Sequence, residues 1–144
     1  MRIDRGTGAA AAGAALAMLS LFAVTSAAQA QVMAVEVTAT VEECPGGTEI
    51  TVVRGSDVVY CYAVANLGDS ATLTNVQVVD DQFGPDPVAT IEALPPGAVQ
   101  TLTATKVFLS HETTSFVTVT ARPSLQGQTL PPVVVRDSVS VDIQ

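Results

Sequence analysis

The chain has 144 residues, of which only 14% are charged, and a formal net charge of −8 at pH 7. Beyond residue 30 the balance is 4 basic residues against 13 carboxylates, a net charge of −9. A surface this acidic repels phosphate backbones and anionic headgroups, which excludes nucleic acid as a partner. The charge is instead typical of a solvated, aggregation-resistant surface.

The first thirty residues have the pattern of a secretory signal peptide. Arg2 and Arg5 precede an apolar stretch at residues 9–24, and residues 26–30 read Ser-Ala-Ala-Gln-Ala. This order of charged, apolar and Ala-x-Ala segments predicts cleavage after Ala30. A retained membrane anchor is the alternative, but the stretch is rich in Ala and Gly and lacks a basic stop-transfer flank. No cysteine lies at the cleavage point, which argues against a lipid anchor. We expect residues 31–144 to be secreted, periplasmic or at the cell surface, without membrane insertion.

Residues 31–144 are expected to form one domain built from strands. Val and Thr supply 22 and 15 of these 114 residues, and both are branched at Cβ, which favours strands over helices. Two-residue alternation at both ends indicates strands with one buried face. The apolar positions are Met33, Val35, Val37, Ala39 and Val41 at the start, and Val133, Val135, Val139, Val141 and Ile143 at the end. Asp137 interrupts the apolar side of the last strand.

Further strands are expected between these two ends. Their ranges are about 49–53, 57–65, 73–80, 88–93, 99–109 and 114–122, separated by turns rich in Gly, Pro, Asn and Asp. Seven or eight short strands at regular spacing predict an all-β antiparallel sandwich, because each sheet must cover its apolar face with another layer.

Cys44 and Cys61 are the two cysteines of the chain, and we expect them to form a disulfide in an oxidising compartment. Alternation places Val58, Tyr60 and Tyr62 on one face of their strand and Cys61 on the other. The bridge should therefore fasten the segment after the first strand to the outer side of the sheet. A redox or metal site is disfavoured, since there is no Cys-x-x-Cys and only one His.

Three segments resemble a known family. Residues 53–69 read Val-Arg-Gly-Ser-Asp-Val-Val-Tyr-Cys-Tyr-Ala-Val-Ala-Asn-Leu-Gly-Asp, residues 73–81 read Leu-Thr-Asn-Val-Gln-Val-Val-Asp-Asp, and residues 94–97 read Leu-Pro-Pro-Gly. They are similar to the conserved-repeat immunoglobulin-like domains of prokaryotic surface proteins, over roughly residues 36–143. The resemblance implies an immunoglobulin-like sandwich, and family members are mostly repeats in adhesins and cell-wall proteins. This chain departs from them by having one copy and no visible wall anchor.

Candidate catalytic groups are few. His111 follows Ser110 directly, and because neighbours on a strand point to opposite faces, we expect the two side chains to diverge. We place His111 in a loop between two strands, as an ordinary surface residue. Adjacent carboxylates, such as Asp80 and Asp81, diverge in the same way. We therefore expect no enzyme and no cofactor.

Asp80, Asp81 and Asp86 surround a Gly/Pro loop and are weak candidates for a calcium site, since Ca²⁺ takes six to eight oxygen ligands. Their spacing matches no calcium loop known to us, and Asp also favours turns, which is the preferred interpretation.

Aromatic side chains could supply a ligand platform, but residues 31–144 hold only five of them and no Trp. Tyr60, Tyr62 and Phe108 are assigned to the core. Phe83, at a loop tip, is the best candidate for an exposed contact, although it could equally plug one end of the sandwich.

The sequence therefore favours a non-catalytic structural or interaction module with an unknown protein or envelope partner. Two alternatives stay open. One is a subunit of an extracellular filament joined by strand exchange or edge pairing, and the other is a module that binds calcium or a small ligand.

Overall fold

The computed structural model describes residues 32–144, which form strands joined by turns and one short 3-10 helix. The prediction of an all-β fold is confirmed for these residues. The elements are β1 (Met33–Thr40), β2 (Glu49–Val52), β3 (Val58–Asn66), β4 (Thr72–Asp80), η1 (Asp81–Phe83), β5 (Ala89–Leu94), β6 (Val99–Lys106), β7 (Thr113–Leu125), β8 (Gln128–Thr129) and β9 (Val133–Ile143). The two-residue β8, which pairs with the end of β7, was not predicted from the sequence.

The predicted signal peptide, residues 1–30, lies outside the described residues. Met33–Gln144 form one compact unit. Within residues 32–144, no helix has the length and apolar character required to cross a membrane.

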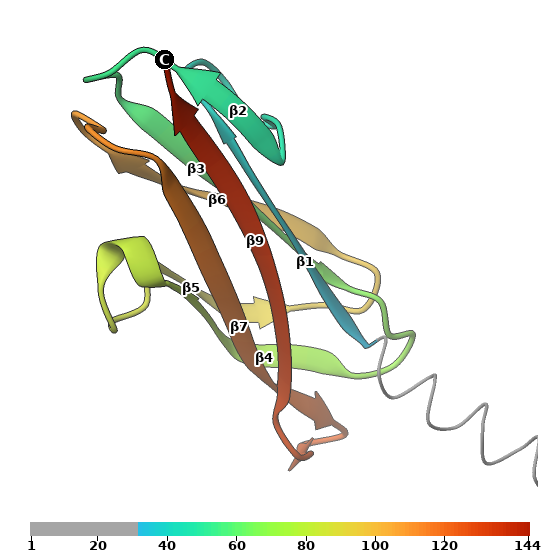
Figure 1. The fold of residues 1–144 in the computed structure, drawn as a ribbon. Coiled ribbons are helices and arrows are strands. Elements are labelled where there is room, and N and C mark those ends of the chain that lie inside the picture. The colour runs from blue at the N-terminus through green and yellow to red at the C-terminus, as the bar shows by residue number, and fades with distance from the viewer. Residues whose placement is uncertain (1–31) are drawn as a thin grey trace, which may run out of the picture. The chain divides into compact units, whose positions relative to one another are not determined.

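The strands form two sheets. One has the order β1-β3-β6, and the other has the order β2-β9-β7-β4-β5, with β8 added beside β7. All pairings are antiparallel except that of β2 with β9, which is parallel. Figure 1 shows the two layers, with β7 and β9 crossing in front of β3 and β6. This arrangement is that of a β-sandwich.

The core lies between the two sheets and draws on both. The largest fully buried side chains are Tyr60, Tyr62, Leu73, Val37, Val58, Val64, Val76, Val78, Val117, Val119, Val139 and Val141. Their alternation along each strand explains the burial, because every second side chain of a strand faces the opposite sheet. One assignment at the start was wrong: Val41 is 54% exposed, since β1 ends at Thr40 and the chain turns away.

Strands β1 and β9 close one side of the sandwich. Asp137, which interrupts the apolar alternation of β9, accepts a hydrogen bond at Oδ2 from the backbone N–H of Val37, 2.9 Å away. One turn of the following loop also pairs with β1, because Ala39 and Gly47 exchange two backbone hydrogen bonds. At Val37 and Ala39 the free backbone edge of β1 is therefore covered by a carboxylate and a loop, two devices that protect sheet edges.

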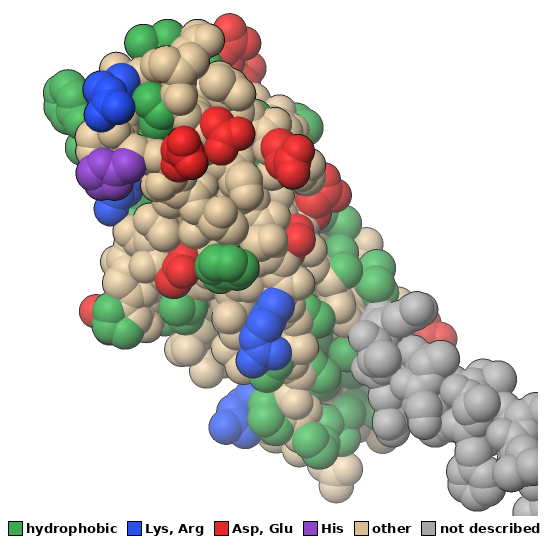
Figure 2. Space-filling model, viewed as in Figure 1, with side chains coloured by type: hydrophobic (Ala, Val, Ile, Leu, Met, Phe, Trp, Pro, Cys, Tyr) green, Lys and Arg blue, Asp and Glu red, His purple; other side chains and the backbone are tan. Residues whose placement is uncertain are grey.

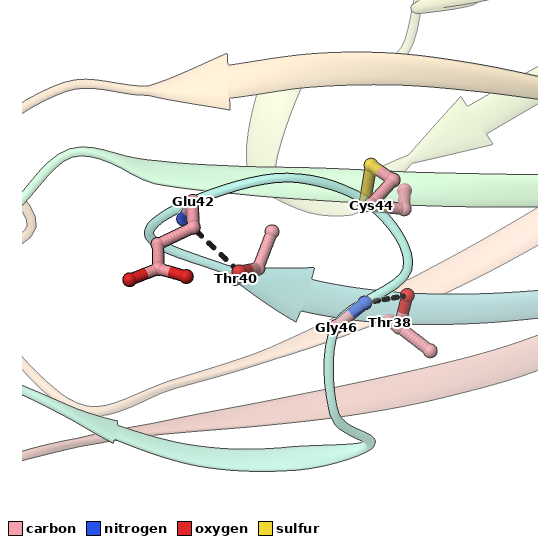
Figure 3. Close-up of a disulfide and its surroundings, with 6 residues drawn as sticks. Thr38, Thr40, Glu42, Cys44 and Gly46 are labelled. Carbon is pink, nitrogen blue, oxygen red and sulfur yellow. Dashed lines mark hydrogen bonds between the residues drawn. A yellow bond between two sulfur atoms is a disulfide. The ribbon is translucent and has the colours of Figure 1, made fainter.

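The loop after β1 folds back over its own strand and is fixed there by the disulfide. Cys44 and Cys61 are joined, with their Cα atoms 5.9 Å apart. Figure 3 shows the hydrogen bond from the Gly46 N–H to the Thr38 hydroxyl, at 3.1 Å. A Cβ at position 46 would lie 1.9 Å from the carbonyl oxygen of Ala39, so only glycine permits this close approach. Because Tyr60 and Tyr62 face the core, Cys61 between them faces outward, and the disulfide lies on the outer side of β3.

The register of β4 against β7 shifts between Thr74 and Gln77, which marks a bulge. Asn75 within it has φ 49°, in the left-handed region that Asn tolerates better than most residues. The bulge bends β4 without breaking it, and Val76 and Val78 still face the core.

Candidate functional site

The first candidate cluster, at the end of β4, is a buried hydrogen-bond network. Asp80 is fully buried, and its two carboxylate oxygens accept from the hydroxyls of Tyr62 on β3 and Ser115 on β7, each at 2.5 Å. Oδ1 also accepts from the N–H of Gln82, at 3.0 Å, which fixes the start of η1. Because Tyr62 and Asp80 belong to opposite sheets, this network joins the two layers through the core. A buried carboxylate needs such partners to offset its desolvation.

The calcium candidates are not brought together. Both oxygens of Asp80 are already bonded inside the core, while Asp81 and Asp86 are exposed. Asp81 Oδ1 accepts from the backbone N–H of Phe116, at 2.9 Å. Within residues 32–144, no group of three or more His, Cys, Asp or Glu is placed to hold a metal ion. Asp80 instead caps the start of η1, and Asp81 fastens η1 to β7.

The two tyrosines beside this network differ in their hydrogen bonding. The Tyr62 hydroxyl donates to Asp80, whereas the Tyr60 hydroxyl is buried with no hydrogen-bond partner among the described residues. Burial, followed by the charges of Asp80 and Asp81, raises the pKa of Tyr60 to about 12. Burial also raises the pKa of Tyr62, and its hydrogen bond to Asp80 raises it further. Both rings therefore stay neutral in the folded chain at physiological pH.

Phe83 covers one end of the core and does not project freely from the loop tip. Its side chain is half-buried, and its ring meets that of Tyr60 edge to face, with centroids 5.8 Å apart and an interplanar angle of 89°. The Lys106 ammonium lies 5.4 Å from the Phe83 centroid and donates to the carbonyl of Gln82, at 2.9 Å. Phe83 was expected either to form an exposed contact or to plug one end of the sandwich, and this geometry matches the second role.

Phe108 was assigned to the core, and that assignment was wrong. Its side chain is 77% exposed, and the preceding Val107 is 59% exposed. The strand β6 ends at Lys106, before the expected end at residue 109, and Phe108 adopts φ 53°, which turns the chain out of the strand. Aromatic residues rarely occupy this left-handed region, at a cost of about 1 kcal/mol or more.

The segment around Phe108 is nevertheless held firmly. Its N–H donates to Asp57 Oδ1, at 3.1 Å. The next residue, Leu109, is buried and exchanges backbone hydrogen bonds with the neighbouring turn, to Ser56 O at 3.0 Å and from Gly55 N at 2.8 Å. We call Val107 and Phe108 the apolar tip. It presents apolar surface from a fixed backbone, a feature that interface residues share.

The outer face of β7 and β9 is mostly polar and uncharged. Two large apolar side chains are exposed on these strands, Phe116 at 59% and Val134 at 44%, and Phe116 lies opposite Ser138. Figure 2 views this face and shows scattered apolar and charged side chains between backbone and other side chains. Acidic side chains, among them the exposed Glu49 and Asp142, gather over β2 and the adjoining end of β9.

A hollow of about 560 Å³ lies beside the disulfide on the outer face of the three-stranded sheet. Its lining residues are Glu36, Thr38, Cys44, Pro45, Cys61, Ala63 and Thr101. Glu36 is the one titratable side chain in this set, so the hollow holds no pair of groups for acid–base chemistry.

Ser110 and His111 do meet, contrary to the expectation that they diverge. The Ser110 hydroxyl lies 2.9 Å from Nδ1 of His111, because both residues are in a loop, where strand alternation does not apply. Both side chains are exposed, and no described residue forms a hydrogen bond to the ring from the other side. A catalytic base needs a third group to orient it, so this pair lacks the arrangement of a nucleophile and its base.

Comparison with known proteins adds no assignment, since no family model matches the chain and no curated protein matches it.

Proposed function

We propose that the chain is an exported, non-catalytic immunoglobulin-like module that contacts another protein at the cell surface or elsewhere outside the cytoplasm. The observation that carries this proposal is the apolar tip. Val107 and Phe108 are exposed on a domain whose core is already filled from both sheets, so their exposure is not a defect of packing. A rigid, exposed aromatic side chain is the type of residue that dominates binding energy at protein interfaces.

The strand order supports the immunoglobulin-like part of the proposal. In that fold the first, second and fifth strands share one sheet, while the third, sixth and seventh share the other. The orders β1-β3-β6 and β9-β7-β4-β5 follow the same division if β2 is a continuation of the first strand that has moved to the opposite sheet. The resemblance to the conserved-repeat domains of prokaryotic surface proteins points to the same fold.

Export is supported by the leader pattern and by the disulfide. The Cys44–Cys61 bridge is of the kind that persists in oxidising compartments. We expect the protein collected outside the cytoplasm to begin at Gln31, which intact-mass measurement would test.

Site-specific photo-crosslinking in intact producing cells tests the interaction. A benzophenone analogue of phenylalanine replaces Phe108 in one variant and Phe116 in another, so that two exposed Phe positions are compared. We expect a discrete adduct with a different protein from position 108 and not from position 116. The proposal is wrong if position 108 yields no adduct with another protein, or if both positions yield the same adducts.

A further inference from the structure

The strand β6 has an open backbone edge. It ends the order β1-β3-β6, and within residues 32–144 it pairs with β3 alone. The Asn66 N–H donates to the Ala98 carbonyl, and this pair continues the register of β3 against β6. The even-numbered residues of β6 therefore direct their backbone N–H and C=O groups toward β3. Successive residues of an antiparallel strand alternate in direction. The N–H and C=O groups of Val99, Thr101, Thr103 and Thr105 therefore point away from the sheet.

This edge lacks the protection that the other edges have. The edge of β1 is covered by Asp137 and Gly47, β2 is only four residues long and carries the exposed Glu49, and the edge strand β5 carries the exposed Glu92. By contrast, β6 is eight residues long, and its sequence Val-Gln-Thr-Leu-Thr-Ala-Thr-Lys has no charge before its last residue and no proline. A long uncharged edge of this kind is a template for another strand.

Exposed apolar side chains lie at both ends of this edge. Val99, at its start, is 65% exposed, and Val107, directly after its end, is 59% exposed. Between them the outward positions are all threonine: Thr101, Thr103 and Thr105, each exposed. The pattern Val, Thr, Thr, Thr, Val is symmetric about Thr103.

We propose that two copies of the chain pair antiparallel through β6, with a twofold axis at Thr103. The inference rests on the proposed function as an interaction module and names a partner for one of its surfaces. In this register Val99 faces Val107 of the second copy, Thr101 faces Thr105, and Thr103 faces itself. The odd-numbered residues, which have free backbone groups, then form the hydrogen-bonded pairs.

A second copy suits this edge better than an unrelated strand for two reasons. Because the sequence is symmetric about Thr103, the contact between Val99 of one copy and Val107 of the other occurs twice, as a self-complementary twofold interface requires. Threonine pairs are also favourable across strands, and the edge brings no like charges together. The result is one six-stranded sheet with β1 at each end, and because the twofold contact uses the β6 edge of both copies, the assembly closes at two copies.

Sedimentation of the purified protein over a wide concentration range tests the pairing. We expect monomer and dimer in a concentration-dependent equilibrium. Thr103→Lys places two ammonium groups together on the axis and should weaken the dimer about tenfold or more. Thr90→Lys, an exposed threonine on the edge strand β5, is the matched control and should leave the dimer unchanged.

A double variant, T101E/T105K, tests the register. Positions 101 and 105 face each other across the proposed axis, so each copy's carboxylate meets the other copy's ammonium and the dimer should persist. Loss of the dimer in this variant would overturn the register. The pairing itself is overturned if the wild-type protein stays monomeric, if T103K dimerises like the wild type, or if T90K is the variant that disrupts it.

These outcomes separate the pairing from the proposed function. A benzophenone adduct of two copies of the chain at position 108, lost in the T103K background, would report the dimer. An adduct with a different protein that survives in T103K would support the interaction module. A monomeric protein that still forms the second adduct overturns the dimer alone.

Discussion

Replacing Tyr62 by phenylalanine should destabilise the domain, whereas the same change at Tyr60 should not. Both rings are fully buried on one face of β3, and each substitution removes a single hydroxyl oxygen. The hydroxyl of Tyr62 donates to Asp80 at 2.5 Å, while that of Tyr60 has no hydrogen-bond partner among the described residues. The pair thus isolates one hydrogen bond from the packing around it.

The expected magnitudes follow from these contacts. Tyr62→Phe leaves a buried carboxylate oxygen without its donor, which should lower the free energy of unfolding by about 2 kcal/mol. For a domain of this size, that corresponds to a fall in the melting midpoint of roughly 8 °C. Tyr60→Phe removes a buried hydroxyl that gains nothing from the fold, so its effect should lie between zero and a gain of about 1 kcal/mol.

Urea unfolding followed by circular dichroism would measure both changes, with thermal melts as a second assay. Equal losses for the two variants would mean that ring packing, and not the bond to Asp80, determines the cost. An unchanged midpoint for Tyr62→Phe would refute the network as a stabilising link between the sheets.

Other consequences can be checked separately. The raised pKa values of Tyr60 and Tyr62 mean that the neutral rings stabilise the fold fully below about pH 10, the pKa of tyrosine in the unfolded chain. This stabilisation is lost as the pH rises toward the folded pKa values, about 12 for Tyr60. Tyrosinate absorbance should therefore appear together with unfolding and not before it. Removing the disulfide by replacing Cys44 and Cys61 with alanine should cost about 3 kcal/mol, measured by urea unfolding, and a cost near zero would contradict the loop-closure argument. Phe108→Gly should preserve stability or raise it by up to about 1 kcal/mol, because glycine adopts positive φ without strain, and a clear loss would show that the ring packs on the domain.

Several features followed from the sequence alone. Alternation predicted which side of β3 is buried, placing Tyr60 and Tyr62 inside and Cys61 on the outer face. Glycine and proline turns separated the strands at nearly the observed positions. These features are local, since side-chain direction in a strand repeats every two residues and turn residues act on their own backbone.

Features that join distant parts of the chain were decided by the tertiary structure. Asp137 read as an interruption of β9, and only the approach of β1 shows it as the partner of Val37, 100 residues away. Asp80 read as a turn former or weak metal ligand until the opposite sheet brought Tyr62 to it. Phe108 is exposed and not buried as expected, because β6 ends at Lys106 and the chain turns at a positive φ. The sequence alone determined the strands and their faces through short-range sterics and periodicity, whereas the partners of buried polar groups and the open edge of β6 depend on which strands meet, which no local pattern specifies.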